Sequence, residues 1–196
     1  MWTLTTFFGV ITVTLGIKMK QSEAIKRLAE FDQRGRYIFA ARDMSKVFPE
    51  DTPRGREATL KRLVNEGILE RPSKGVYLYA LSQHKGPDTL EMIAKTLRRG
   101  EYSYISLESA LSEYGVISQI PVGRLTVMTT GRKGEYKTPY GVIEFTHTKR
   151  LVPEILAVTK DRGRPLKIAA KMAALRDLKR VGRNTHLIDE EVSQDD

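Results

Sequence analysis

Cysteine is absent from this chain. Its absence excludes a disulfide framework and the thiolate ligands of zinc fingers, so the fold must be held by packing, and a cytoplasmic location is indicated. The three histidines, His84, His147 and His186, have no metal-ligand spacing between them. The sequence therefore predicts neither a metal site nor another cofactor.

The common catalytic motifs are also missing. The chain has no P-loop, no G-x-G-x-x-G and no G-x-S-x-G. The serines between Ser106 and Ser112 have no base and orienting group at motif spacing. An enzyme acting on nucleic acid would need carboxylates such as Glu108, Glu113 and Glu144 to converge on a metal. A binding protein is favoured over an enzyme.

Long apolar runs are confined to the N-terminus, where residues 1–17 carry no charge and five threonines. A signal peptide would place its positive charges before the apolar run, and a membrane span usually needs about 20 apolar residues. We expect neither, and no membrane association. The simplest interpretation of residues 1–18 is an upstream start codon, with the natural start at Met19; a β-prone arm that pairs with a partner or a second copy is the alternative.

Positive charge is in excess. The chain has 33 Lys and Arg against 24 Asp and Glu, a net charge of +9 and a pI near 9.7. This balance favours an anionic partner, which can be nucleic acid, an acidic protein or a membrane surface. With 196 residues, 40% of them hydrophobic, the chain can bury one good core or two small ones.

Residues 19–82 have the element order of a winged helix-turn-helix. Ser22 is expected to cap a helix that runs to about Phe31, followed by a strand at Tyr37–Phe39 and a helix at Ala40–Val47. A cationic helix after Thr52 then leads through Gly67 into a hairpin whose tip is Arg71–Gly75. The order helix, strand, helix, helix, hairpin is that of a winged helix-turn-helix DNA-binding domain.

The helix after Thr52 is asymmetric. Leu60, Leu63 and Val64 fall on one side, whereas Gly55, Ala58, Thr59 and Arg62 lie opposite, with Arg54 and Asn65 at the margin. Long basic and short polar side chains there are suited to phosphates and base edges. The expected DNA-binding residues are Arg54, Arg56, Thr59, Lys61 and Arg62 in the helix, and Arg71, Ser73 and Lys74 in the wing. The alternative is ordinary solvated charge, since Pro53–Gly75 has only six cations against three anions.

After a breaker-rich joint at residues 83–87, we expect a small α+β domain over residues 88–183. Helices and strands alternate there, and the two strands richest in Val, Thr, Ile and aromatic residues are joined by a loop, Gly131–Tyr136, which we interpret as a hairpin tip that touches DNA or a partner. The expected elements are helices at Asp88–Arg99 and Leu107–Tyr114 and strands at Glu101–Ile105, Arg124–Thr130 and Tyr140–His147.

The last expected helix, Leu166–Val181 after Pro165, is amphipathic and basic. Lys160–Arg183 carries nine cations against two anions, whereas residues 184–196 form an acidic tail with a net charge of −5. A second DNA-contacting surface and a solvated outer face are equally consistent with this helix. The residues of that possible second basic surface are Arg164, Lys167, Lys171, Lys179 and Arg180.

Three phrases in the second half carry a resemblance. They are S-A-L-x-x-Y-G at 109–115, T-T-G-R at 129–132 and T-P-x-G-x-x-E-F at 138–145. In this order and spacing the chain resembles, from Met19 onward, the AbiEi-like antitoxins of the AbiE abortive-infection systems. The fold class expected is α+β, with an N-terminal winged helix-turn-helix followed by a small antitoxin-like domain with a basic C-terminal helix. The cationic segment after Pro165 and the acidic tail depart from the family's better-known members.

The resemblance implies a component of a bacterial type IV toxin–antitoxin system. Such a protein represses its own operon by binding inverted repeats, and opposes a nucleotidyltransferase-like toxin without a stable complex. Without antitoxin activity, the alternatives are a stand-alone winged-helix regulator or a protein-interaction module. No heptad zipper is present, so we expect a monomer that pairs on double-stranded DNA, or a weak dimer.

Overall fold

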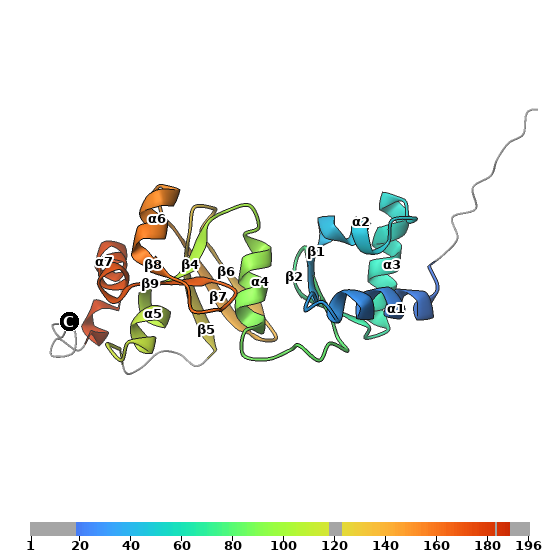
Figure 1. The fold of residues 1–196 in the computed structure, drawn as a ribbon, viewed down its shortest axis with the longest axis horizontal. Helices are drawn as coiled ribbons and strands as arrows, with labels where there is room; N and C mark the ends of the chain where they lie inside the picture. Colours follow the sequence, from blue (N-terminus) through green and yellow to red (C-terminus); the bar gives the residue numbers. More distant parts are fainter. Residues whose placement is uncertain (1–18, 118–122, 183, 189–196) are drawn as a thin grey trace, which may run out of the picture.

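The computed structural model describes residues 19–117, 123–182 and 184–188. The fold is a mixed α+β arrangement with two sheets (Figure 1): a three-stranded sheet of order β1-β3-β2 and a six-stranded sheet of order β6-β7-β5-β4-β9-β8. The expected N-terminal extension lies outside the described residues, as do residues 189–196 of the expected acidic tail. Residues 184–188 include a short turn of helix, η2 (Thr185–Leu187), and Asn184 Nδ2 donates to Glu108 at 2.8 Å.

The smaller sheet is antiparallel throughout and packs with the first three helices. Its elements are α1 (Gln21–Asp32), β1 (Ile38–Ala40), η1 (Ala41–Asp43), α2 (Met44–Val47), α3 (Pro53–Asn65), β2 (Leu69–Ser73) and β3 (Val76–Tyr79). Ser22 does not cap α1 as expected, because the helix already begins at Gln21 after Lys20. The single helix expected over Ala40–Val47 is divided into η1 and α2, and Ala40 ends β1.

Local sequence signals define both ends of α3. Thr52 Oγ1 accepts a hydrogen bond from Gly55 N at 3.1 Å, and Pro53 occupies the first turn. At the other end Gly67 has a φ of +71°, and Ile68 N donates to Leu63 O at 2.9 Å. The chain then enters β2, and the pairing of Ser73 with Val76 leaves a turn tighter than the expected tip.

The larger sheet corrects the expected hairpin at Gly131–Tyr136. Strands β5 (Arg124–Thr129) and β7 (Gly141–His147) pair in parallel, so they are not the two arms of one hairpin. Part of the expected loop is instead β6 (Gly134–Thr138), which turns back into β7 as an antiparallel edge strand. The sequence of β6 has few apolar residues, because no residue of this strand is buried. The strand therefore could not be recognised from an apolar pattern.

The expected helix Leu166–Val181 is two elements. Residues Lys167–Ala169 form β9, which pairs in parallel with β4 (Ser103–Ile105), and only Lys171–Val181 forms the helix α7. Ile168 is buried in the sheet, and Met172 of the expected apolar stripe is exposed. The remaining elements of this part are α4 (Thr89–Leu97), α5 (Leu107–Glu113), α6 (Val152–Val158) and β8 (Thr159–Lys160).

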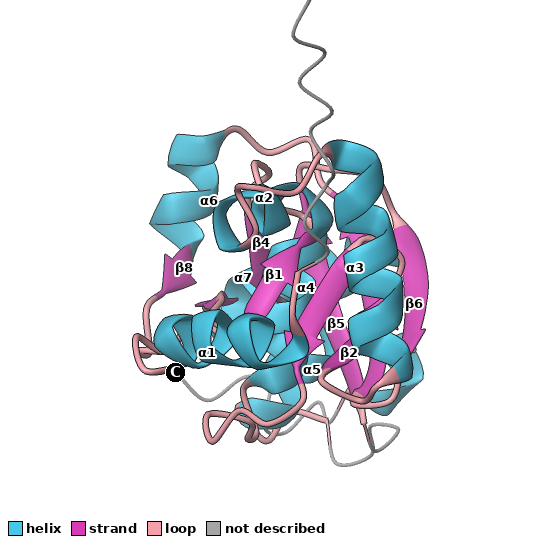
Figure 2. Ribbon diagram, turned by 90° about the vertical axis from the view of Figure 1, so that its right-hand side faces the viewer, coloured by secondary structure: helices cyan, strands magenta, loops and turns pink. Residues whose placement is uncertain are grey.

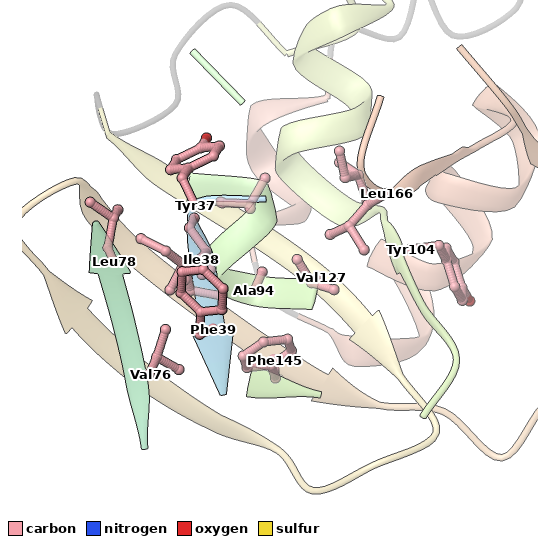
Figure 3. Close-up of a cluster of buried hydrophobic side chains, with 14 of the residues drawn as sticks. Tyr37, Ile38, Phe39, Val76, Leu78, Ala94, Tyr104, Val127, Phe145 and Leu166 are labelled. Carbon is pink, nitrogen blue, oxygen red and sulfur yellow. The ribbon is translucent and has the colours of Figure 1, made fainter. Parts of the chain in front are cut away.

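One continuous apolar core extends through both sheets. Figure 1 shows α4 between them, and the close-up in Figure 3 places side chains of β1 and β3 in the same cluster as Ala94 of α4 and Phe145 of β7. Polar contacts join the sheets too: Tyr37 Oη lies 3.2 Å from Thr89 Oγ1. In the described part of the chain, no helix is long and apolar enough to cross a bilayer.

A buried polar junction holds α7 against the larger sheet. Asp177 is completely buried; one carboxylate oxygen lies 2.7 Å from Arg150 Nη1, and the other accepts hydrogen bonds from Tyr104 Oη at 3.2 Å and Ser106 Oγ at 2.9 Å. Arg150 also donates to Tyr104 Oη at 2.7 Å. Burial, with the nearby Asp177 carboxylate, raises the pKa of Tyr104. The junction is therefore a neutral phenol between a carboxylate and a guanidinium.

Removal of the carboxylate in Asp177→Ala should lower the free energy of unfolding by about 3–5 kcal/mol, because Arg150 would be left half-buried without its counterion. Denaturant titration followed by circular dichroism measures the change. The exposed Asp88 is the matched control, and Asp88→Ala should cost less than about 0.5 kcal/mol. Equal losses in the two variants would contradict a stabilising role for the junction.

Asp32, at the end of α1, is hydrogen-bonded to the segment that leads into the second half of the chain. It accepts hydrogen bonds from Ser82 Oγ and from His84 Nδ1, the latter at 3.1 Å. Burial acts to raise the pKa of Asp32, but these hydrogen bonds outweigh it and hold that pKa below its ordinary value of 3.8.

A lowered carboxyl pKa stabilises the fold above the pKa of the unfolded chain, and the contribution is lost as the pH falls through the folded pKa. Asp32→Asn should therefore melt at a lower temperature than the wild type at neutral pH, and the difference should shrink below about pH 4. Thermal unfolding across the acid range tests this expectation. A difference that is constant with pH would assign the effect to packing.

Candidate nucleic-acid interface

One face of α3 is polar and open to solvent. Arg54, Glu57, Ala58, Lys61 and Asn65 are its exposed residues, and their spacing of three, four and seven places them on one stripe. Leu60 and Leu63 are buried on the opposite side, as expected. The helix is therefore fixed by its apolar side and presents a mixed polar stripe outward.

The hairpin β2–β3 lies beside this stripe, as Figure 2 shows for α3 and β2. A groove between them is lined by Glu57, Lys61, Val64, Asn65, Arg71 and Tyr77. The Arg71 guanidinium lies over the Tyr77 ring, 5.9 Å from its centroid, which holds the cation at the groove. Helix and hairpin thus form one surface with cations on both sides.

Four of the expected DNA-binding residues are exposed. Arg54 and Lys61 lie on the α3 stripe, Arg71 lies on β2, and Lys74 lies in the hairpin turn with the half-buried Ser73 beside it. Within the described residues, these four cations have no ion pair and no side-chain hydrogen bond. They are available to an anionic ligand.

Two other expected residues serve the fold. Arg56 Nη2 donates to the Asp51 carbonyl at 2.9 Å. Arg62 donates to the Met19 carbonyl at 2.6 Å and forms an ion pair with Glu66 at 3.2 Å. Both guanidinium groups are half-buried and turned toward the protein, so in this conformation they do not belong to the exposed stripe.

The expected exposure of Thr59 is wrong. Its exposed fraction is only 5%, because it lies next to Leu60 and one turn before Leu63, within the buried side of the helix. It cannot reach a base edge without displacement of its neighbours. Tyr77 was not expected at the site; its alternation with the buried Val76 and Leu78 in β3 is the signal that places it on the outer face.

The possible second basic surface is not one continuous set. Arg164 is bound to Glu91 and, at 2.5 Å, to Glu113. Burial acts to lower its pKa, but the hydrogen bonds to the two carboxylates raise that pKa overall. Lys167 is exposed on β9, Lys171 is half-buried at the start of α7, and Lys179 and Arg180 are exposed near its end.

The three carboxylates considered for a metal site take part in separate contacts. Glu108 accepts from Asn184, Glu113 is paired with Arg162 and Arg164, and Glu144 is paired with Arg124 at 2.8 Å. Across residues 19–117, 123–182 and 184–188, no three side chains of His, Asp or Glu come together in a way that could hold a metal ion.

Comparisons with known proteins bear on the fold alone. No family model matches the chain, and no curated protein sequence does so. Among solved structures, the chain is similar to the crystal structure of the RV2827C protein from Mycobacterium tuberculosis, with a TM-score of 0.54 and 12% sequence identity. The similarity covers 82% of this chain and 61% of that one, so the chain spans about three fifths of the length of that protein.

Lys61 and Arg62 are adjacent in α3, but only Lys61 belongs to the exposed stripe. Substitution of each by alanine should therefore change the free energy of unfolding by a different amount. Arg62→Ala should lower the free energy of unfolding by about 1–3 kcal/mol, because it removes a charged hydrogen bond to the Met19 carbonyl. Lys61→Ala, on the exposed stripe, should change it by less than about 0.5 kcal/mol. Denaturant titrations of both variants test the assignment, and an equally stable Arg62→Ala protein would return that residue to the exposed set.

Proposed function

We propose that this chain is a sequence-specific DNA-binding transcriptional repressor whose residues 19–82 act as a winged helix-turn-helix. The observation that carries the proposal is the single surface formed by the polar stripe of α3 and the cationic hairpin β2–β3. A helix with one buried side and one polar side can enter a major groove while its neighbours stay folded.

In this arrangement α3 is the recognition helix. Asn65 is suited to paired contacts with an adenine edge, and Lys61 and Arg54 to guanine edges or phosphates. Arg71 and Lys74 in the wing reach the backbone or an adjoining minor groove. Glu57 on the same stripe repels phosphate, which favours a defined register over uniform attraction.

We extend the proposal to an AbiE-like antitoxin, on the resemblance of residues 109–145 to that family. The protein would then repress its own operon as monomers paired on inverted repeats, and oppose a nucleotidyltransferase-like toxin. The test is co-expression with a nucleotidyltransferase-like toxin of an AbiE-type system. Growth restored by this chain supports the antitoxin role, and growth arrest that it leaves unchanged removes it.

A protein-interaction module is the second candidate, favoured by exposed apolar side chains at one end of the larger sheet. Leu151 and Leu156 at α6 and Met172 on α7 have exposed fractions of 69%, 43% and 50%. Exposed apolar side chains that form one contiguous patch are a feature of protein contacts. Binding to a protein that persists at high salt, without retention on DNA, would favour this role.

The DNA-binding proposal is tested by fluorescence anisotropy on the duplex upstream of the gene and on a scrambled duplex. Asn65→Ala should weaken binding to the upstream duplex alone, by about 1–3 kcal/mol. Lys74→Ala should weaken both duplexes alike and reduce the slope of log K against log salt by about 1.

Lys160→Ala is the matched control, since Lys160 is an exposed lysine on β8 at the edge of the larger sheet opposite β6. It should leave both affinities unchanged. An equal loss in Lys74→Ala and Lys160→Ala would mean that positive charge attracts DNA generically, and would contradict the assignment of the wing. A loss in Asn65→Ala that is equal on both duplexes would contradict the assignment of α3.

A further inference from the structure

Tyr102 is an exposed aromatic residue that lines one of two neighbouring hollows in the larger sheet unit. Its exposed fraction is 45%. One hollow, about 680 Å³, is lined by Glu101, Thr130–Lys133 and His147, and the other, about 300 Å³, is lined by Tyr102 itself, the end of α4 and Pro165–Lys167. Glu101 lines both hollows, so they adjoin.

Contacts with Arg98 and His147 hold the loop Thr130–Lys133 in one conformation. Arg98, only 9% exposed, donates to the Arg132 carbonyl at 2.8 and 3.1 Å, and its guanidinium lies 4.1 Å from the centroid of the Phe145 ring. His147 Nδ1 lies 2.9 Å from the Gly131 carbonyl. A Cβ at Gly131 would meet Glu101 Cγ at 2.9 Å, so the loop approaches Glu101 as closely as glycine allows.

Tyr102 is fixed by the same loop. Its backbone N donates to Thr130 Oγ1 at 3.1 Å, and its carbonyl accepts from Thr130 N at 2.9 Å. These bonds fix the backbone of Tyr102, so less backbone entropy is lost when a ligand stacks on its ring.

Four exposed cations line the two hollows: Lys95 and Lys167 lie in the hollow that contains Tyr102, and Arg132 and Lys133 lie in the adjoining one. None of the four side chains has an ion pair or hydrogen bond with another described residue.

The two carboxylates beside them are engaged. Glu101 accepts from Thr130 Oγ1, and Asp161 accepts from Gly163 N, both at 2.9 Å. These neutral donors leave both carboxylates charged, but the four cations outnumber them, so the net charge of the site is positive. Two arginines lie nearby: Arg164 forms ion pairs with two glutamates, and Arg98 donates hydrogen bonds to the loop Thr130–Lys133.

We propose that this groove binds an unpaired nucleotide of a single-stranded nucleic acid, with the base stacked on Tyr102 and the flanking phosphates on the lysine and arginine side chains. An exposed aromatic ring flanked by cations recognises a base and its phosphates without regard to sequence. A base inside a duplex is already stacked on its neighbours and cannot reach the ring. The site is separate from the α3 surface and does not depend on the function proposed for it.

The test is fluorescence anisotropy of the full chain with labelled oligothymidylate and oligoadenylate. Tyr102→Ala should weaken binding of both about tenfold, whereas Tyr102→Phe, which keeps the stacking face, should bind as the wild type does. Lys133→Gln should reduce the salt slope by about 0.7 for a lost phosphate contact, and Lys137→Gln, an exposed lysine on β6 outside the groove, should not.

Competition with ATP distinguishes the source of the nucleotide. Displacement of the oligonucleotide shows that the groove accepts a free nucleotide, and no displacement shows that it needs a strand; both outcomes support the site. The upstream duplex is measured in parallel, and its affinity should be the same in Tyr102→Ala and the wild type. Single-strand binding that is absent, or equal in Tyr102→Ala and the wild type, would overturn the proposal.

Discussion

The packing of α4 between the two sheets is the constraint on which the rest of the structure depends. Ile93 and Ala94 are fully buried, and Thr89 at its first turn meets Tyr37 of the smaller sheet. Its one buried carboxylate, Glu91, is neutralised by Arg164 from the segment before β9. A helix with apolar contacts on more than one side cannot leave either sheet without exposing core, so the two sheets share a single core. The α3 surface and the Tyr102 groove are therefore parts of one structure.

A second contact joins the hairpin to the larger sheet. Tyr140 Oη donates to Glu70 at 2.6 Å, and Lys85 lies 3.3 Å from the same carboxylate. Burial and the Glu70 carboxylate raise the pKa of Tyr140, which keeps the phenol a donor at neutral pH. Glu70 immediately precedes Arg71 in β2, so the strand that carries a groove cation is fastened from behind by the other sheet. A hairpin held in this way has less conformational entropy to lose than a free hairpin would.

Local signals in the sequence were sufficient for α3, because its cap at Thr52, its proline at the first turn and its terminal Gly67 act within a few residues. They were insufficient for β6, whose exposed edge needs no apolar pattern, and for β9, where Leu166 and Ile168 fit either a strand or the helix expected there. The exposed cations were harder to predict from the sequence than the strands. Arg62 and Arg164 are removed from it by Met19 and Glu91, partners that lie far away in the sequence and that no local pattern identifies.

The count of 33 Lys and Arg therefore overstates the number of cations that an anionic ligand would meet. Many of the arginines are committed to carboxylates or carbonyls, as Arg27, Arg98 and Arg150 are, because a planar guanidinium can bind two acceptors at once. Among the described arginines, those that are exposed and have neither an ion pair nor a side-chain hydrogen bond are Arg34, Arg54, Arg71 and Arg132. The other exposed cations without such contacts are lysines. Some of these exposed cations lie beside an aromatic ring: Lys61 and Arg71 line the groove with Tyr77, and Lys95 and Lys167 line the hollow with Tyr102. Scattered charge on a protein surface favours solubility, whereas charge beside an aromatic ring favours recognition of an anionic ligand. This difference distinguishes the α3 surface and the Tyr102 groove from the rest of the basic surface.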